Sequence, residues 1–266
     1  MIGRTAGPLF GVALLLSALT CAAGGPLVAQ RPVQHIRSQN VQPVFDGYEV
    51  NQDGSYTLWF GYLNRNQEEH LEIAIGPDNR FEPGPPDRGQ PTHFVPQWQK
   101  SVFSVVVPKD FGKQELTWRL TSRGRTETVV ANLKPYSIID RHKTTIEGTK
   151  GENLAPSVQV EPATQTIART SAAELSVSAT DDGLPANPVT QKPVGLFVRW
   201  RKFRGPATGR VTFAPAASPL VQGKASTRAT FDEPGEYVLQ AVVDDGSLFV
   251  GTYCCWVNRE LKVTVK

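Results

Sequence analysis

Hydrophobic and polar residues alternate with a period of two along much of the chain between residues 45 and 138. This alternation places every second side chain on the same face of a β-strand. Asp53 and Gly54 lie between two such runs and are typical of a tight hairpin turn. The residues that share one face in the early runs are Tyr56, Leu58, Phe60 and Tyr62, then Leu71, Ile73 and Ile75. We therefore predict a β-sandwich of about six or seven strands over residues 45–138.

The alternation returns between residues 157 and 266. Leu196, Val198 and Trp200 are expected on one face of a strand, and Arg199 and Arg201 on the other. Further sets that share a face are Leu175 and Val177, then Tyr237, Leu239, Ala241 and Val243, then Leu261, Val263 and Val265. Residues 139–156 between the two regions are polar and lack periodicity, which is typical of a linker. The sequence thus predicts an all-β chain with two tandem β-sandwich domains.

One stretch of the second region, DEPGEYVLQA, resembles the F-strand signature of immunoglobulin-like domains, in which an acid, a glycine and a tyrosine precede a core residue. The corresponding residues here are Asp232, Gly235, Tyr237 and Leu239. Leu239 stands where antibody-type domains carry a cysteine, and Trp200 resembles the core tryptophan of strand C. NLAPSVQVEP and the paired DDG turns resemble polycystic-kidney-disease-type (PKD) and cadherin-like modules of bacterial exported proteins. The resemblance covers residues 153–266 and implies a sandwich without an inter-sheet disulfide.

The N-terminus has the pattern of a secretory signal peptide. Arg4 precedes an apolar run over residues 8–20, which is shorter than the roughly 20 residues that span a bilayer. Small residues follow, and cleavage after Ala29 would leave residues 30–44 as a tail. Cys21 offers an alternative, a lipid anchor, although the preceding threonine is unusual for such a site. The protein is expected in the periplasm or outside the cell, with a membrane contact only if Cys21 is lipidated.

The overall charge does not indicate a nucleic-acid or membrane partner. The chain has 28 Lys and Arg residues against 25 Asp and Glu, and Arg4 is the only charge within residues 1–29. A nearly neutral chain is not typical of nucleic-acid-binding proteins. We expect no nucleic-acid partner.

A stretch rich in proline and glycine, residues 76–98, breaks the even spacing of the strands. Loops longer than about 12–15 residues are usually functional or disordered. This one carries Asp78, Asp87, His93 and, at its end, Trp98. A structural cover over a sheet edge, a ligand contact and a catalytic lid are the three interpretations. His93 lacks a second histidine at zinc-site spacing, which argues against a metal centre.

Two acidic pairs follow expected strands, each before a glycine. In an immunoglobulin-like sandwich the loops after strands B and F meet at one end. The carboxylates concerned are Asp181, Asp182, Asp244 and Asp245. Calcium takes six to eight oxygen ligands, so a calcium site is one interpretation. Turns that use Asp-Gly for their backbone geometry are the other.

Five residues are candidates for binding, including Trp98 at the end of the stretch 76–98. Arg199 and Arg201 would form a basic stripe for a polyanion, or a solvated face. Trp98 has polar neighbours, as tryptophans that stack on sugars do, although packing against a second sheet explains it as well. Phe249 and Trp256 lie within an insertion near the end of the chain, where exposed aromatics would form a contact patch and buried ones a local core.

Cys254 and Cys255 are adjacent in an exported chain, where thiols normally pair. Neighbouring residues of a strand point to opposite faces, so a bond between them needs a distorted turn. Free thiols, a vicinal disulfide and intermolecular pairing all remain open.

The favoured function from the sequence is a non-catalytic binding or structural module of the bacterial envelope, without a cofactor, that contacts a protein or a polysaccharide. No nucleophile–base set, phosphate loop or zinc cluster is recognisable, so we predict that the chain is not an enzyme. A hydrolase that uses Asp78, Asp87 and His93 under a lid is one alternative. A calcium-stabilised adhesive module is the other.

Overall fold

The computed structural model describes residues 36–145, 151–186, 190, 194–247 and 254–266. The expected signal peptide with Cys21, part of the tail, and Phe249 lie outside these residues. Within them the protein is all-β, as predicted, with a 3-10 turn at Pro135–Ser137. No helix in the described part of the chain is long and apolar enough to cross a membrane. Residues Gln34–Lys266 form one compact unit.

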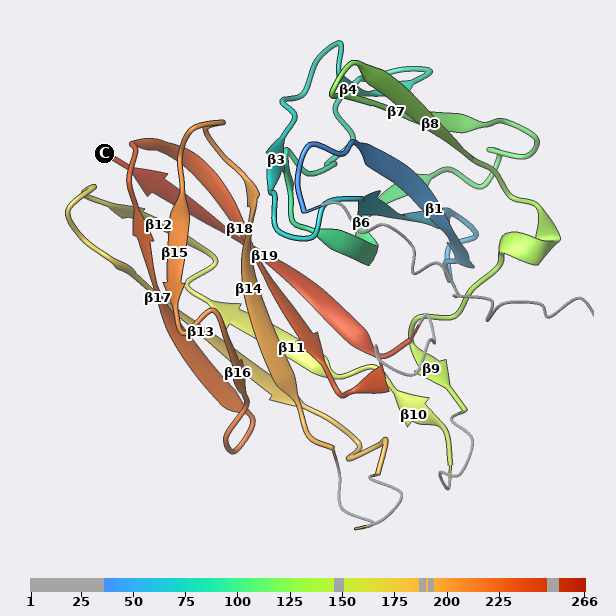
Figure 1. The fold of residues 1–266 in the computed structure, drawn as a ribbon. Coiled ribbons are helices and arrows are strands. Elements are labelled where there is room, and N and C mark those ends of the chain that lie inside the picture. The colour runs from blue at the N-terminus through green and yellow to red at the C-terminus, as the bar shows by residue number, and fades with distance from the viewer. Residues whose placement is uncertain (1–35, 146–150, 187–189, 191–193, 248–253) are drawn as a thin grey trace, which may run out of the picture. The chain divides into compact units, whose positions relative to one another are not determined.

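The N-terminal β-region, residues 41–144, contains two three-stranded sheets and a short strand pair (Figure 1). One sheet has the order β1 (Val41–Val50), β2 (Tyr56–Asn64) and β6 (Gln97–Val107). The other has the order β4 (Asn79–Glu82), β7 (Leu116–Ser122) and β8 (Arg125–Ala131). The pair is β3 (Leu71–Glu72) with β5 (His93–Phe94). An aromatic cluster fills the core: Phe60, Phe81, Phe94, Phe103 and Trp118.

The C-terminal β-region, residues 153–265, has a four-stranded and a five-stranded sheet. The first sheet has the order β11 (Ser157–Glu161), β13 (Ala173–Thr180), β17 (Lys224–Phe231) and β15 (Val211–Ala214). The second has the order β12 (Thr164–Ile167), β19 (Trp256–Val265), β18 (Gly235–Asp244), β14 (Phe197–Arg204) and β16 (Ala217–Pro219). The first order corresponds to strands A, B, E and D of immunoglobulin-like sandwiches, and the second places β19, β18 and β14 as strands G, F and C.

The residues that carried the immunoglobulin resemblance occupy the core of this region. Tyr237, near the start of β18, is buried and donates a hydrogen bond of 2.8 Å from its hydroxyl to the carbonyl of Glu233. Such a bond at this corner is a feature of immunoglobulin-like domains. Leu239 is fully buried, and Trp200 of β14 is 5% exposed. Apolar packing takes the place of a disulfide between these sheets.

The stretch 76–98 differs from the expected open loop, because it contains β4, β5 and the start of β6. Asn79 explains its order. The buried Asn79 amide donates hydrogen bonds to the carbonyls of Ile73 and Pro91, at 2.9 and 2.8 Å, and accepts one from the Trp118 indole at 3.0 Å. Gln90, also buried, donates to the carbonyl of Pro86. These two buried polar side chains therefore hold the backbone of residues 76–98 in place, although the sequence pattern of this stretch predicts a loop.

The expected boundaries are also shifted. Strand β1 begins at Val41, inside the predicted tail, and the predicted linker contains β9 (Lys143–Thr144) paired with β10 (Asn153–Leu154). Phe203 of β14 belongs to the hydrophobic cluster of the N-terminal β-region, and its carbonyl accepts a 3.1 Å hydrogen bond from the Thr92 amide. The two regions share packing, so their separation into two domains stays a prediction.

Candidate functional site

A cleft of about 530 Å³ opens beside Trp98, and we call it the Trp98 cleft. The Trp98 side chain is 54% exposed, in contrast to the buried tryptophans of both cores. The residues that line the cleft with it include Gln97, Gln99, Trp200, Arg201 and Asn258. An exposed indole in a cleft that amide-bearing residues also line is suited to a ligand that has apolar faces and hydroxyl edges.

Alternation along β6 places Trp98 on its outward face, together with Ser104 and the exposed Val106. The register between β2 and β6 shifts between Phe60 and Tyr62, as it does at a β-bulge, and the alternation is the same on both sides of the shift. A Cβ atom on Gly61 would lie 2.2 Å from the Gln99 carbonyl, so glycine is needed for this close approach. Gln97 has a φ of 69°, in the left-handed region that is rare for residues other than glycine. The backbone strain therefore lies next to the exposed indole.

The predicted basic stripe is not an open cationic face. The Arg199 guanidinium lies 2.6 Å from an Asp244 carboxylate oxygen. The Arg201 guanidinium donates to Gln240 through two of its nitrogens and to the Gln99 side-chain oxygen at 2.9 Å. Burial lowers the pKa of Arg201. Both arginines are held by neighbouring side chains, and Arg201 fixes the position of Gln99 in the Trp98 cleft.

A second cavity, of about 690 Å³, adjoins this cleft, and we call it the His93 cavity. Val95, Trp200 and Arg201 line both spaces. In the cavity, a ring nitrogen of His70 lies 2.9 Å from Nε2 of His93. Nδ1 of His93 lies 2.6 Å from an oxygen of Glu72. Burial, and then His93, lower the pKa of His70.

The sequence analysis missed His70, Glu72 and Lys202. The pairing of β3 with β5 places Glu72 opposite His93, and this register carries no signal in the periodicity. Lys202 of β14 is buried, and its ammonium donates to Glu72, Pro206 and Gly209 at 2.7, 2.6 and 2.7 Å. Two residues that line the cavity each have one buried polar atom without a hydrogen-bond partner among the described residues: Oε2 of Glu72 and Nε1 of Trp200.

The candidates for a hydrolytic site are not assembled. Asp87 forms a two-pronged ion pair with Arg204, at 2.7 and 3.0 Å, and this contact lowers the Asp87 pKa. Asp78 accepts a hydrogen bond from the Thr121 amide through its backbone carbonyl. In the described part of the chain, the hydrogen-bond partners of His93 are His70 and Glu72, and neither is a nucleophile of acyl transfer.

The four aspartates proposed for calcium have protein partners. Asp182 accepts from the Leu154 amide, and Asp244 is paired with Arg199. Asp245 accepts from the Asn153 side chain at 2.8 Å and from the Ser247 amide at 2.9 Å. Burial raises the Asp181 pKa to about 6, with Asp245 contributing. Among the residues that the structure describes, no three His, Cys, Asp or Glu side chains are grouped so as to hold a metal ion.

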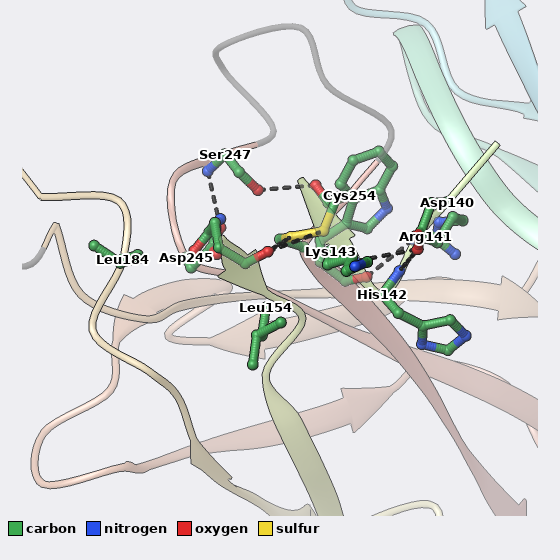
Figure 2. The surroundings of a disulfide bond; sticks show 12 residues. Asp140, Arg141, His142, Lys143, Leu154, Leu184, Asp245, Ser247 and Cys254 are labelled. Carbon is green, nitrogen blue, oxygen red and sulfur yellow. Dashed lines mark hydrogen bonds between the residues drawn. A yellow bond between two sulfur atoms is a disulfide. The ribbon is translucent and has the colours of Figure 1, made fainter. Parts of the chain in front are cut away.

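Cys254 and Cys255 form a vicinal disulfide, which is one of the three states left open by the sequence. Both residues are buried, and the Ser247 hydroxyl donates to the Cys254 carbonyl at 2.9 Å (Figure 2). Trp256, which follows, is 2% exposed. Its ring packs on the Arg141 guanidinium, and Trp256 is also one of the residues that line the Trp98 cleft.

Comparisons with known proteins assign no family. No protein-family model matches the chain, and no curated protein matches it. Among solved structures, the chain is similar to one described as "Crystal structure of the S-layer protein SbsC domains 4 and 5", with 12% sequence identity and a TM-score of 0.25. That match covers 85% of this chain and 98% of the other. A similarity at this TM-score carries no argument about function.

Proposed function

We propose that this protein is an exported, non-catalytic module that binds a polysaccharide of the bacterial envelope through the Trp98 cleft. The observation that carries the proposal is the exposure of the Trp98 indole, at 54%, at a cleft whose neighbours are amide and guanidinium side chains. Sugar rings present C–H faces that pack on an indole and hydroxyl edges that hydrogen-bond to amides. Gln97, Gln99 and Asn258 supply such amides here.

The cleft is also held in place before a ligand arrives. Arg201 anchors Gln99, and the Asn258 amide donates to the Ser101 carbonyl at 2.7 Å. A binding surface that is already ordered loses less side-chain entropy on association. The cleft therefore has the rigidity of a binding site, whereas Asp87, one of the residues of the hydrolase alternative, is held in an ion pair with Arg204.

Binding can be tested with Trp98→Ala. Purified protein without residues 1–29 would be assayed for co-sedimentation with isolated peptidoglycan sacculi, and for retarded migration in gels that contain neutral or anionic soluble polysaccharides. We expect binding to at least one of these glycans and a loss of about tenfold or more in Trp98→Ala. Tyr136→Ala is the matched control, because Tyr136 is an exposed aromatic that does not line the cleft. Absence of binding, or equal binding by Trp98→Ala, would reject the proposal.

Export needs a separate measurement. The intact mass of the protein expressed in a bacterial host with its full N-terminus should correspond to a chain that begins at Gln30. A mass that includes a lipid on Cys21 would instead identify the anchored form. An uncleaved chain in the cytoplasm would contradict export.

A further inference from the structure

We propose that the His93 cavity binds one neutral, hydroxyl-rich sugar unit and forms an inner subsite next to the Trp98 cleft. The inference rests on the proposed function and deepens it, because it names the chemistry of a second binding position. Three features of the cavity carry it: two unpartnered polar atoms, cations that already have partners, and continuity with the cleft.

The unpartnered atoms are a donor and an acceptor. Nε1 of Trp200 is a donor only, and Oε2 of Glu72 is an acceptor when the carboxylate is ionised. Both atoms are buried, and both residues line the cavity. Trp200 is 95% buried, since its exposed fraction is 5%. Buried polar groups without partners are costly, so a ligand that both donates and accepts gains by filling this space. A hydroxyl group does both.

The charges of the cavity favour a neutral ligand. An ammonium has three donors, and those of Lys202 bind Glu72, Pro206 and Gly209. The same contact neutralises the Glu72 carboxylate. Arg201 is bound to side chains on both sides, and Arg210, which is exposed at the cavity, pairs with Asp232 at 3.6 Å. An anion would have to displace one of these partners, whereas a hydroxyl does not.

The remaining lining fits the faces of a sugar ring. The cavity lining also has an apolar part, which contrasts with the polar histidines and consists of Val95, Val211, Phe213 and Ala216. Its volume of about 690 Å³ lies within the 300–1,000 Å³ usual for small-ligand sites. Because Val95, Trp200 and Arg201 also line the Trp98 cleft, one oligosaccharide can occupy both positions. Affinity should therefore increase with chain length beyond one unit.

The Trp200 indole proton is a direct probe of this cavity. The chain has five tryptophans, so a nitrogen–proton NMR spectrum of labelled protein contains five indole signals. Trp200→Phe assigns the relevant signal by its loss. Titration with glucose, N-acetylglucosamine and myo-inositol should shift that signal for at least one of these polyols. Sodium acetate at matched ionic strength should leave it in place. A Trp200 signal that no polyol moves, or that acetate moves as far, would overturn the inference.

Substitutions separate binding from folding. Trp200→Phe removes an indole N–H that has no partner among the described residues and also leaves a small cavity in the core, so the melting temperature should fall as it does in other large-to-small core variants, while affinity for the polysaccharide falls about three- to tenfold. Trp118→Phe is the matched control, because the Trp118 N–H is bonded to Asn79 and lies outside the cavity. It should lower stability and leave affinity unchanged. Polysaccharide binding that is lost in Trp98→Ala but intact in Trp200→Phe would reject the inner subsite and keep the proposed function.

Discussion

The Arg141 guanidinium lies over the Trp59 ring, 4.0 Å from the ring centre. The guanidinium is also 4.7 Å from the centre of the Trp256 ring, and it donates a 2.9 Å hydrogen bond to the Trp256 carbonyl. Arg141 is only 5% exposed, and cation–π contacts are stronger when water is excluded. One side chain from the expected linker thus joins β2 to β19.

This stack predicts a large cost for Arg141→Lys. An ammonium lacks the planar group that stacks between two rings, so charge alone does not preserve the contact. We expect the free energy of unfolding to fall by about 1–3 kcal/mol in urea titrations. Arg228→Lys is the control, because Arg228 pairs with Glu174 on the surface and should cost little. Equal stabilities for the two variants would show that the stack contributes nothing.

Asp46 predicts a dependence of stability on pH. Burial raises its pKa from 3.8 to about 6, and the Ser101 amide and Arg141 offset only part of that rise. The folded state therefore holds the Asp46 proton more tightly than the unfolded state. Stability should fall as pH rises from about 4 to about 6 and level off above, with a contribution of up to about 3 kcal/mol.

Asp46→Asn isolates this contribution, because the amide does not titrate. Its unfolding free energy, measured from pH 4 to 7, should fall less steeply than that of the natural protein. Asp53→Asn should keep the original slope over this range, since Asp53 is exposed and hydrogen bonds from Ser55 lower its pKa. A slope unchanged by Asp46→Asn would mean that the carboxyl stays ionised.

The backbone at Cys255 predicts which residue can replace it. Its φ is 89°, in the left-handed region that glycine adopts without a steric penalty. Without the disulfide, Cys254→Ala with Cys255→Gly should be more stable than Cys254→Ala with Cys255→Ala by about 1 kcal/mol. Thermal unfolding of the two double variants measures the difference. If alanine is equally stable at position 255, the positive φ is not retained once the sulfurs are removed.

Calcium should not stabilise the described part of the protein. Asp244 is paired with Arg199, and Asp245 is bonded to Asn153 and Ser247, so an ion would have to displace these partners. We expect the same melting temperature with millimolar calcium and with chelator. A ligand present at about 100 times its dissociation constant adds about 2.7 kcal/mol, so a specific site would be evident. A higher melting temperature with calcium would support ion binding by the four aspartates.

The strands could be predicted because their alternation is local. Residues 173–180 were expected as a strand and form β13, and the run that begins at Gly235 forms β18. The buried position of Tyr237 could also be anticipated from the F-strand signature. The hydrogen bond of its hydroxyl is local as well, because the Glu233 carbonyl is only four residues away. Hairpins and short corner motifs depend on residues that are close in sequence, so they can be predicted from one sequence alone.

The candidate site could be predicted only in part, because its contacts join distant segments. Trp98 stood out as an aromatic among polar residues, but the cleft beside it also needs Trp200, Arg201 and Asn258 from strands far along the chain. Lys202 and Glu72 are 130 residues apart, and the two histidines are separated by 23. Periodicity reports which face of a strand a residue occupies, not which other strand lies against it. Asn79 illustrates the same limit, because an asparagine in a sequence favours a turn, whereas the structure buries its side-chain amide.

The backbone of Phe203 belongs to β14 of the C-terminal β-region, whereas its ring packs in the core of the N-terminal β-region. A fragment that ends before β14 would have a cavity among its core aromatic residues. A fragment that starts after β8 would expose the apolar Phe203 ring to solvent. The packing of Phe203 needs both β-regions. Recombination that exchanged only one of them would therefore have to preserve the side chains that surround this ring.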